Sequence, residues 1–129
     1  IDPVWALSIS SEGLLDGMYY VSVLNAELLD DADGNPAIRV YYDFKNNSED
    51  TISFHSALYI RSYQDGISLS QSYLTNASET DENIYAEIAS GETIRASAVF
   101  KLRNETSAVE ANVEAYTSYA AVGQTYNIK

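Results

Sequence analysis

The feature that most constrains the fold is a strict alternation over residues 37–47. Apolar side chains alternate there with polar or amphipathic ones, and the apolar set is Ile38, Val40, Tyr42 and Phe44. Side chains at a period of two point to opposite faces of a β-strand. We therefore predict a strand that lies with one face on a hydrophobic core.

Turn sequences flank this strand, DADGNP before it and NNSED after it. Gly34 can adopt positive φ without steric cost, and Asp33 can accept a bond from a backbone amide two residues on. The acidic loop also has some likeness to a calcium loop. An EF-hand alignment with Gly34 as its sixth residue fails, because Leu29 then stands first and Val40 twelfth. We expect a tight hairpin and no metal site.

Similar short segments recur along the chain, with a turn signal between most of them. The expected strands cover residues 4–10, 19–28, 37–47, 54–63, 67–69, 84–88, 94–102 and 109–115. The hydrophobic phase changes near Val23 and Leu24, which predicts a bulge or a switch between sheets. The segment 109–115 could also form a helix, but its alternation favours a strand. The pattern predicts an all-β, immunoglobulin-like antiparallel β-sandwich of about seven to eight strands, without a helix.

The length of 129 residues predicts a single domain over residues 1–129. Residues 1–17 are interpreted as an N-terminal extension or an extra strand, with residues 12–17 as a connector. Residues 71–83 are polar and are expected to form the longest loop, and residues 119–129 a weakly patterned C-terminal tail.

The charge balance excludes some partners. Nineteen Asp and Glu stand against seven Lys and Arg, a net charge of −12, so nucleic acids and anionic lipid surfaces should be repelled. There is no Cys for a disulfide or a thiolate metal site, and no apolar run approaches the ~20 residues of a membrane span. Because the chain starts without Met, we expect an export signal upstream of Ile1 and consider a lipid anchor there.

Several segments together resemble a known family. They are the tyrosine-rich strand that ends in Asn46-Asn47-Ser48, the Gln64-Asp65-Gly66 corner and the Gly91 that precedes the segment 94–102. The chain resembles an uncharacterised immunoglobulin-like family of secreted or lipid-anchored proteins of Gram-positive bacteria. In that family Pro usually stands where this chain has Ser90. The resemblance implies a β-sandwich outside the cell and no enzymatic activity.

Catalysis has few candidate residues. His55 is the single histidine and could join a Ser–His–Asp triad, but no GxSxG motif supports that hypothesis. We interpret His55 as a turn or edge residue, and Asp43 as the partner of a cation on a neighbouring strand. The prediction is therefore a protein that is not an enzyme and has no cofactor or catalytic residue.

Four tyrosines are the candidate ligand-binding residues: Tyr41, Tyr59, Tyr63 and Tyr116. They lie opposite the main apolar stripes, where they could cover the edges of the sandwich or form a binding face. We expect a non-enzymatic extracellular or cell-surface module that binds a protein or a glycan. The alternatives are a small-molecule or sugar-binding accessory protein that uses the tyrosine face and, last, a hydrolase that uses His55.

Overall fold

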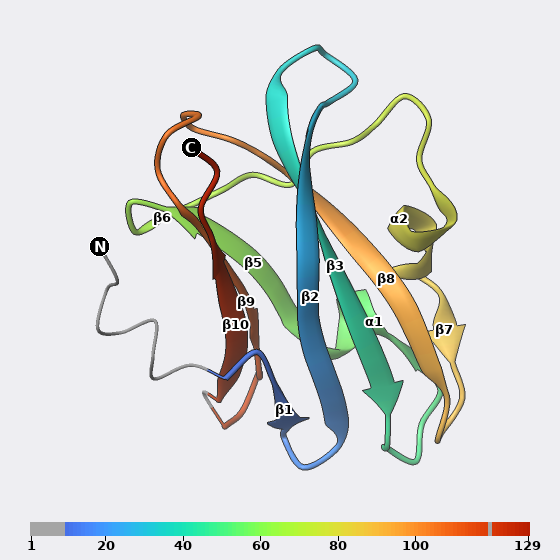
Figure 1. Ribbon diagram of the computed structural model, residues 1–129. Coiled ribbons are helices and arrows are strands. Elements are labelled where there is room, and N and C mark those ends of the chain that lie inside the picture. The colour runs from blue at the N-terminus through green and yellow to red at the C-terminus, as the bar shows by residue number, and fades with distance from the viewer. Residues whose placement is uncertain (1–9, 119) are drawn as a thin grey trace.

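The alternating segment forms β3 (Pro36–Asn46), which lies inside one of two antiparallel sheets that face each other (Figure 1). The computed structural model describes residues 10–118 and 120–129. The first sheet has the order β1-β2-β3-β8, with β1 (Glu12–Leu15), β2 (Tyr19–Asp30) and β8 (Thr93–Lys101). The second has the order β10-β9-β5-β6, with β10 (Ala121–Tyr126), β9 (Val109–Glu114), β5 (Tyr59–Gln64) and β6 (Ile67–Ser68). A short pair, β4 (Ile52–Ser53) and β7 (Glu87–Ile88), completes the strands described. The predicted β-sandwich is confirmed.

The core lies between the two sheets and is rich in aromatic rings. Tyr42 and Phe44 of β3 are fully buried, as is Phe54, which directly follows β4. The Phe54 ring stacks on that of Phe44 at 4.9 Å and meets that of Tyr42 edge-on at 5.3 Å. Phe100 of β8 is also buried, while Ile94 is only partly so. The face predicted for β3 is therefore the core face.

The expectation that the chain has no helix is wrong at two places. Residues 54–57 form α1 (Phe54–Ala57), begun by the Ser53 hydroxyl, which accepts a bond from the Ser56 amide at 3.2 Å. The predicted strand 54–63 therefore reduces to β5. The second helix, α2 (Glu79–Asn83), lies inside the expected long loop, and its first turn is closed by a capping box between Ser78 and Asp81. Neither helix is long and apolar enough to cross a membrane.

The hairpin between β2 and β3 confirms two predictions and corrects a third. The register shifts between Val23 and Ala26, where a bulge was expected, and Gly34 has a φ of +80°. The carboxylate that organises the turn is that of Asp31, however, and not that of Asp33. Its Oδ1 accepts the amides of both Asp33 and Asn35 at 2.9 Å.

The two ends of the chain carry more structure than their patterns indicate. Residues 12–15, expected in a connector, form β1, and residues 121–126 of the expected tail form β10 beside β9. The weak pattern of β10 has a physical reason. Val122 is the side chain that it buries deeply, and a Cβ atom at Gly123 would lie only 2.9 Å from the Ala111 carbonyl oxygen of β9. Residues 1–9, which include most of the strand expected at 4–10, lie outside the described residues.

Candidate functional site

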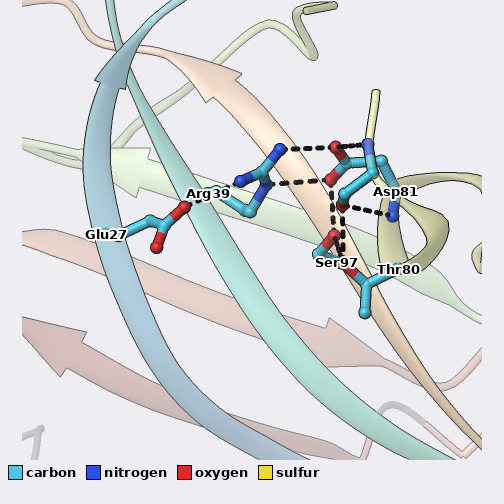
Figure 2. A network of polar contacts seen from close by, with 6 residues as sticks. Glu27, Arg39, Thr80, Asp81 and Ser97 are labelled. Atoms are coloured by element: carbon cyan, nitrogen blue, oxygen red, sulfur yellow. Dashed lines mark hydrogen bonds and ion pairs between the residues drawn. The ribbon is translucent and has the colours of Figure 1, made fainter. Parts of the chain in front are cut away.

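A buried arginine on the outward face of β3 organises the covering layer of the first sheet. Arg39 is 9% exposed and donates to both carboxylate oxygens of Asp81, from Nε at 3.0 Å and from Nη2 at 2.6 Å. Its Nη1 donates to Glu27 of β2 at 2.7 Å, as Figure 2 shows. This two-point contact joins α2 to the middle of the sheet.

The Asp81 carboxylate has further donors. Ser97 of β8 donates its hydroxyl to Oδ1 (Figure 2). The amide of Ser78 donates to Oδ2 at 3.0 Å. Burial alone would raise the pKa of Asp81, but the bonds from Arg39, Ser97 and Ser78 hold that pKa below its usual value. The carboxylate is thus a structural anchor, with its bonding capacity used inside the protein.

The segment before α2 covers the free edge of β8. The Ser72 amide donates to the Val99 carbonyl at 2.7 Å, and the Lys101 amide donates to the Ser70 carbonyl at 2.9 Å. The Ser72 hydroxyl also donates to Asp31 Oδ2 at 2.7 Å. This bond and the backbone amide of Asn35 lower the pKa of Asp31. The acidic hairpin between β2 and β3 therefore bonds to the loop that covers β8. The described residues contain no group of three or more His, Asp or Glu placed for a metal.

Three of the four predicted tyrosines gather on the outward side of the second sheet. The rings of Tyr59 and Tyr116 lie 4.2 Å apart and nearly perpendicular, and the guanidinium of Arg61 lies 4.8 Å from the centre of the Tyr59 ring. Tyr63 donates its hydroxyl to Glu114 at 2.9 Å. Tyr41 points outward from β3, in the other sheet, so it does not belong to this cluster.

A recess of about 360 Å³ opens beside this cluster, between the edge of β5 and the edge of β8. Its floor consists of core side chains, including Ile60, Leu69 and Phe100. Tyr59, Tyr116 and His55 are among the residues that line it. The recess is therefore apolar at its base and aromatic and polar around its opening.

His55 lies in α1 with an exposed side chain, and its ring centre is 4.9 Å from that of Tyr85. Among the described residues, no side-chain hydrogen bond joins His55 to a serine or a carboxylate. The geometry assembles no triad around it. Asp43, by contrast, pairs across the strands with Arg95, Oδ1 to Nε at 2.8 Å, as the sequence predicted.

Sequence reasoning missed Arg39 and Asp81, although two signals pointed to them. The Ser78 to Asp81 spacing has the form of a capping box within a segment interpreted as a loop. Arg39 is a charged residue between Ile38 and Val40, in a strand that has the core on one face only. If another element covers the outward face of the sheet, a charged residue there such as Arg39 is buried and needs a partner of opposite charge.

The family described as a domain of unknown function, DUF5067, matches residues 6–115 of the chain. The sequence matches no protein that has a curated description.

Three solved structures from Gram-positive bacteria have a similar fold. The candidate lipoprotein ycdA of Bacillus subtilis has a TM-score of 0.68 at 13% identity, over 92% of this chain and 39% of that one. This chain thus spans about two fifths of that lipoprotein. A protein of Enterococcus faecalis has a TM-score of 0.67 at 19% identity, with all of both chains covered. An uncharacterized β-sandwich protein of Clostridium difficile has a TM-score of 0.57 at 16% identity, over 94% of this chain and 91% of that one. At these identities the likeness establishes the fold.

The lowered pKa of Asp81 predicts an acid-dependent loss of stability. The pKa of Asp81 is lower in the folded state than in the unfolded state, where it is about 3.9. Such a carboxyl stabilises the fold at pH values above the unfolded-state pKa, and this stabilisation is lost as the pH falls through the folded-state pKa. In urea unfolding between pH 7 and pH 2.5, wild type should exceed Asp81→Asn in stability at neutral pH. The difference should shrink below about pH 4. A difference that stays constant over the whole range would contradict this role of Asp81.

Proposed function

The chain belongs to the DUF5067 family, and on that footing we propose that it is a non-enzymatic module, displayed at the cell surface, that binds an extended segment of a partner protein. The single observation that carries this proposal is an edge of β5 that no other described strand covers, beside the recess with core side chains at its floor. The proposed binding does not involve the ion pairs of Arg39, because Arg39 lies on β3 in the other sheet.

The edge of β5 has backbone groups available for pairing. β6 pairs with β5 only at Tyr63 and Gln64, and the Leu69 amide then donates to the Ser62 carbonyl at 2.8 Å. Among the strands that the structure describes, none lies beside residues 59–61 on this side. Because strand backbone groups alternate in direction, the N–H and C=O of Ile60 face the same side as the Ser62 carbonyl. An added peptide strand could bond there.

The recess next to this edge suits an apolar side chain of such a peptide. Its floor contains Ile60, Leu69 and Phe100, so a methyl or phenyl group placed there would lose contact with water. Tyr59, Tyr116 and Arg61 stand around it. Tyrosine and arginine are the residue types that most often dominate the binding energy of protein interfaces.

The same geometry makes a sugar the second candidate ligand. A sugar ring stacks on a free aromatic face, but the Arg61 guanidinium lies over the Tyr59 ring, and Tyr116 meets that ring at 87°. The lining of the recess does contain groups that could bond to sugar hydroxyls, among them Arg61, Ser68 and Gln71, so the covered ring face of Tyr59 is what disfavours a sugar. A hydrolase is the weakest candidate, because the His55 ring contacts Tyr85 and is held in no triad.

Two observations support a location at the cell surface. One similar structure is a candidate lipoprotein, and the net charge of −12 suits a soluble domain exposed to the medium. With intact cells that express the full-length protein, added protease should degrade this domain while a cytoplasmic marker stays whole. Protection of the domain until the cells are lysed would contradict the proposed location.

Binding can be tested with a displayed library of random twelve-residue peptides selected against the whole chain. We expect enriched peptides with apolar residues at alternate positions, and amide NMR shifts on binding that centre on residues 59–62. Tyr59→Ala and Tyr116→Ala should each weaken a selected peptide about tenfold or more, as central aromatic contacts do.

Tyr20→Ala is the matched control. Tyr20 is 38% exposed, comparable to Tyr59 at 43%, but it lies on β2 of the other sheet, so its loss should leave peptide affinity unchanged. The proposal fails if the selected peptides map to another surface, or if both Tyr59→Ala and Tyr116→Ala bind as wild type does. It also fails if oligosaccharides bind at the recess and the peptides do not.

A further inference from the structure

A second cavity, next to the recess beside β5, lies under the covering layer of the first sheet. It has a volume of about 360 Å³, within the range of about 300–1,000 Å³ that is usual for small-molecule sites. It lies between the loop before α2, the helix itself and the outward face of β8. Its lining includes Tyr73, Leu74, Glu82, Tyr85, Ser97 and Val99.

The cavity is held open by bonds on both sides. On one side the loop is fixed by the bond from the Ser72 amide to the Val99 carbonyl and by that from the Ala32 amide to the Tyr73 carbonyl at 2.9 Å. On the other side α2 is fixed by the pair between Asp81 and Arg39. A site that is already formed in the free protein binds a ligand without a large ordering cost.

The polar groups at the base of the cavity are already used. Ser97 donates to Asp81, and the Ser72 side chain donates to Asp31. Both hydroxyl groups thus have a partner within the protein and do not need a bond from a ligand. The rest of the lining is mostly apolar and includes Leu74, Ala77 and Val99. The body of the ligand is therefore expected to be apolar.

The rim selects for charge. Tyr73 and Tyr85, 69% and 48% exposed, are among the residues that line the cavity, and the ring centre of Tyr85 also lies 4.9 Å from that of His55. Glu82 also lines it, and among the described residues it makes no ion pair. Aromatic faces and a carboxylate both attract a cation, and a cation is attracted further by the net charge of −12.

The ion pair between Asp81 and Arg39 at the base of the cavity does not make the site positively charged. Arg39 pairs with both Asp81 and Glu27, so this group of three keeps one negative charge in excess. The ion-pair network at the base of the cavity therefore has the same sign of net charge as Glu82 at the rim.

We infer that this cavity binds a small organic cation with an apolar body, such as a substituted ammonium compound. Its apolar part lies on Leu74 and Val99, and its ammonium group lies between Tyr73, Tyr85 and Glu82. The site adjoins the recess beside β5, and Gln71 and Ala98 line both, but Tyr73, Leu74 and Glu82 line this cavity alone.

Choline and its uncharged isostere 3,3-dimethylbutan-1-ol provide a matched pair of probes, because a quaternary carbon replaces the quaternary nitrogen. NMR titration of the whole chain should give saturable binding of choline, with shifts at Tyr73, Leu74, Tyr85 and Val99. Choline should bind more tightly than the alcohol by about three- to tenfold, and added salt should reduce that preference.

Variants separate charge from shape. Glu82→Gln should weaken choline about two- to fivefold and leave the alcohol unchanged. Tyr73→Leu, which keeps an apolar side chain, should also weaken choline more than the alcohol. Glu79→Gln is the control, since it removes the same charge from the same helix at a residue outside the cavity lining. Thermal melts of each variant establish that it is folded.

Three results would overturn the inference. The alcohol could bind as tightly as choline, which would make the cavity a neutral apolar site. Choline could shift residues elsewhere or fail to bind saturably up to tens of millimolar. Glu79→Gln could also weaken choline as much as Glu82→Gln does, which would leave only the general attraction of an acidic protein.

Discussion

The ion pair between Arg39 and Asp81 holds the outer layer of the first sheet in place. Arg39 points away from the core of the sandwich, yet it is buried, because α2 and the loop before it cover this face. Two hydrogen bonds from one guanidinium to one carboxylate define both the position and the orientation of the helix. α2 has five residues and buries none of them, so its own packing contributes little to its position.

Such a pair is stable only when its remaining polar atoms are also bonded, because removal of two charges from water costs several kcal/mol for each ion. The structure meets this condition with Glu27, Ser97 and Ser78. One consequence is that the same contacts that anchor the layer leave an apolar cavity beneath it, with an acidic rim. On the other sheet, β6 is short, and no other described strand covers residues 59–61 of β5, which lie beside the recess. The two candidate binding sites thus arise where the coverage of the sandwich is incomplete.

The sequence predicted the sandwich because a period of two reports directly which side chains share a face. β3 and β9 follow their expected faces, and Gly34 takes the predicted positive φ. What the alternation cannot report is what covers the polar face of a strand. The sequence described the outward side of β3 only as polar or amphipathic, whereas in the structure α2 covers Arg39 there.

The elements that were missed are short or weakly patterned. α1 has four residues, fewer than a helical period needs to be recognised, and β10 buries Val122 as its one deeply apolar contact. The candidate binding site was predicted in part: Tyr59, Tyr63 and Tyr116 share one face, but alternation alone could not place Tyr41 on the opposite sheet. Contacts between residues far apart in sequence, such as Asp31 with Ser72, have no local signal at all.

A double-mutant cycle on Arg39 and Asp81 tests the central claim most directly. Free energies of unfolding would be measured in urea for wild type, Arg39→Met, Asp81→Leu and the double variant. If the pair anchors the outer layer, Arg39→Met leaves the buried Asp81 carboxylate without its cation, and Asp81→Leu leaves the buried Arg39 with Glu27 as its ion-pair partner. The loss of stability in the double variant should then be smaller than the sum of the two single losses by about 1 kcal/mol or more. Losses that add within about 0.5 kcal/mol would mean that the two residues act independently, and that α2 is held by something other than their pair.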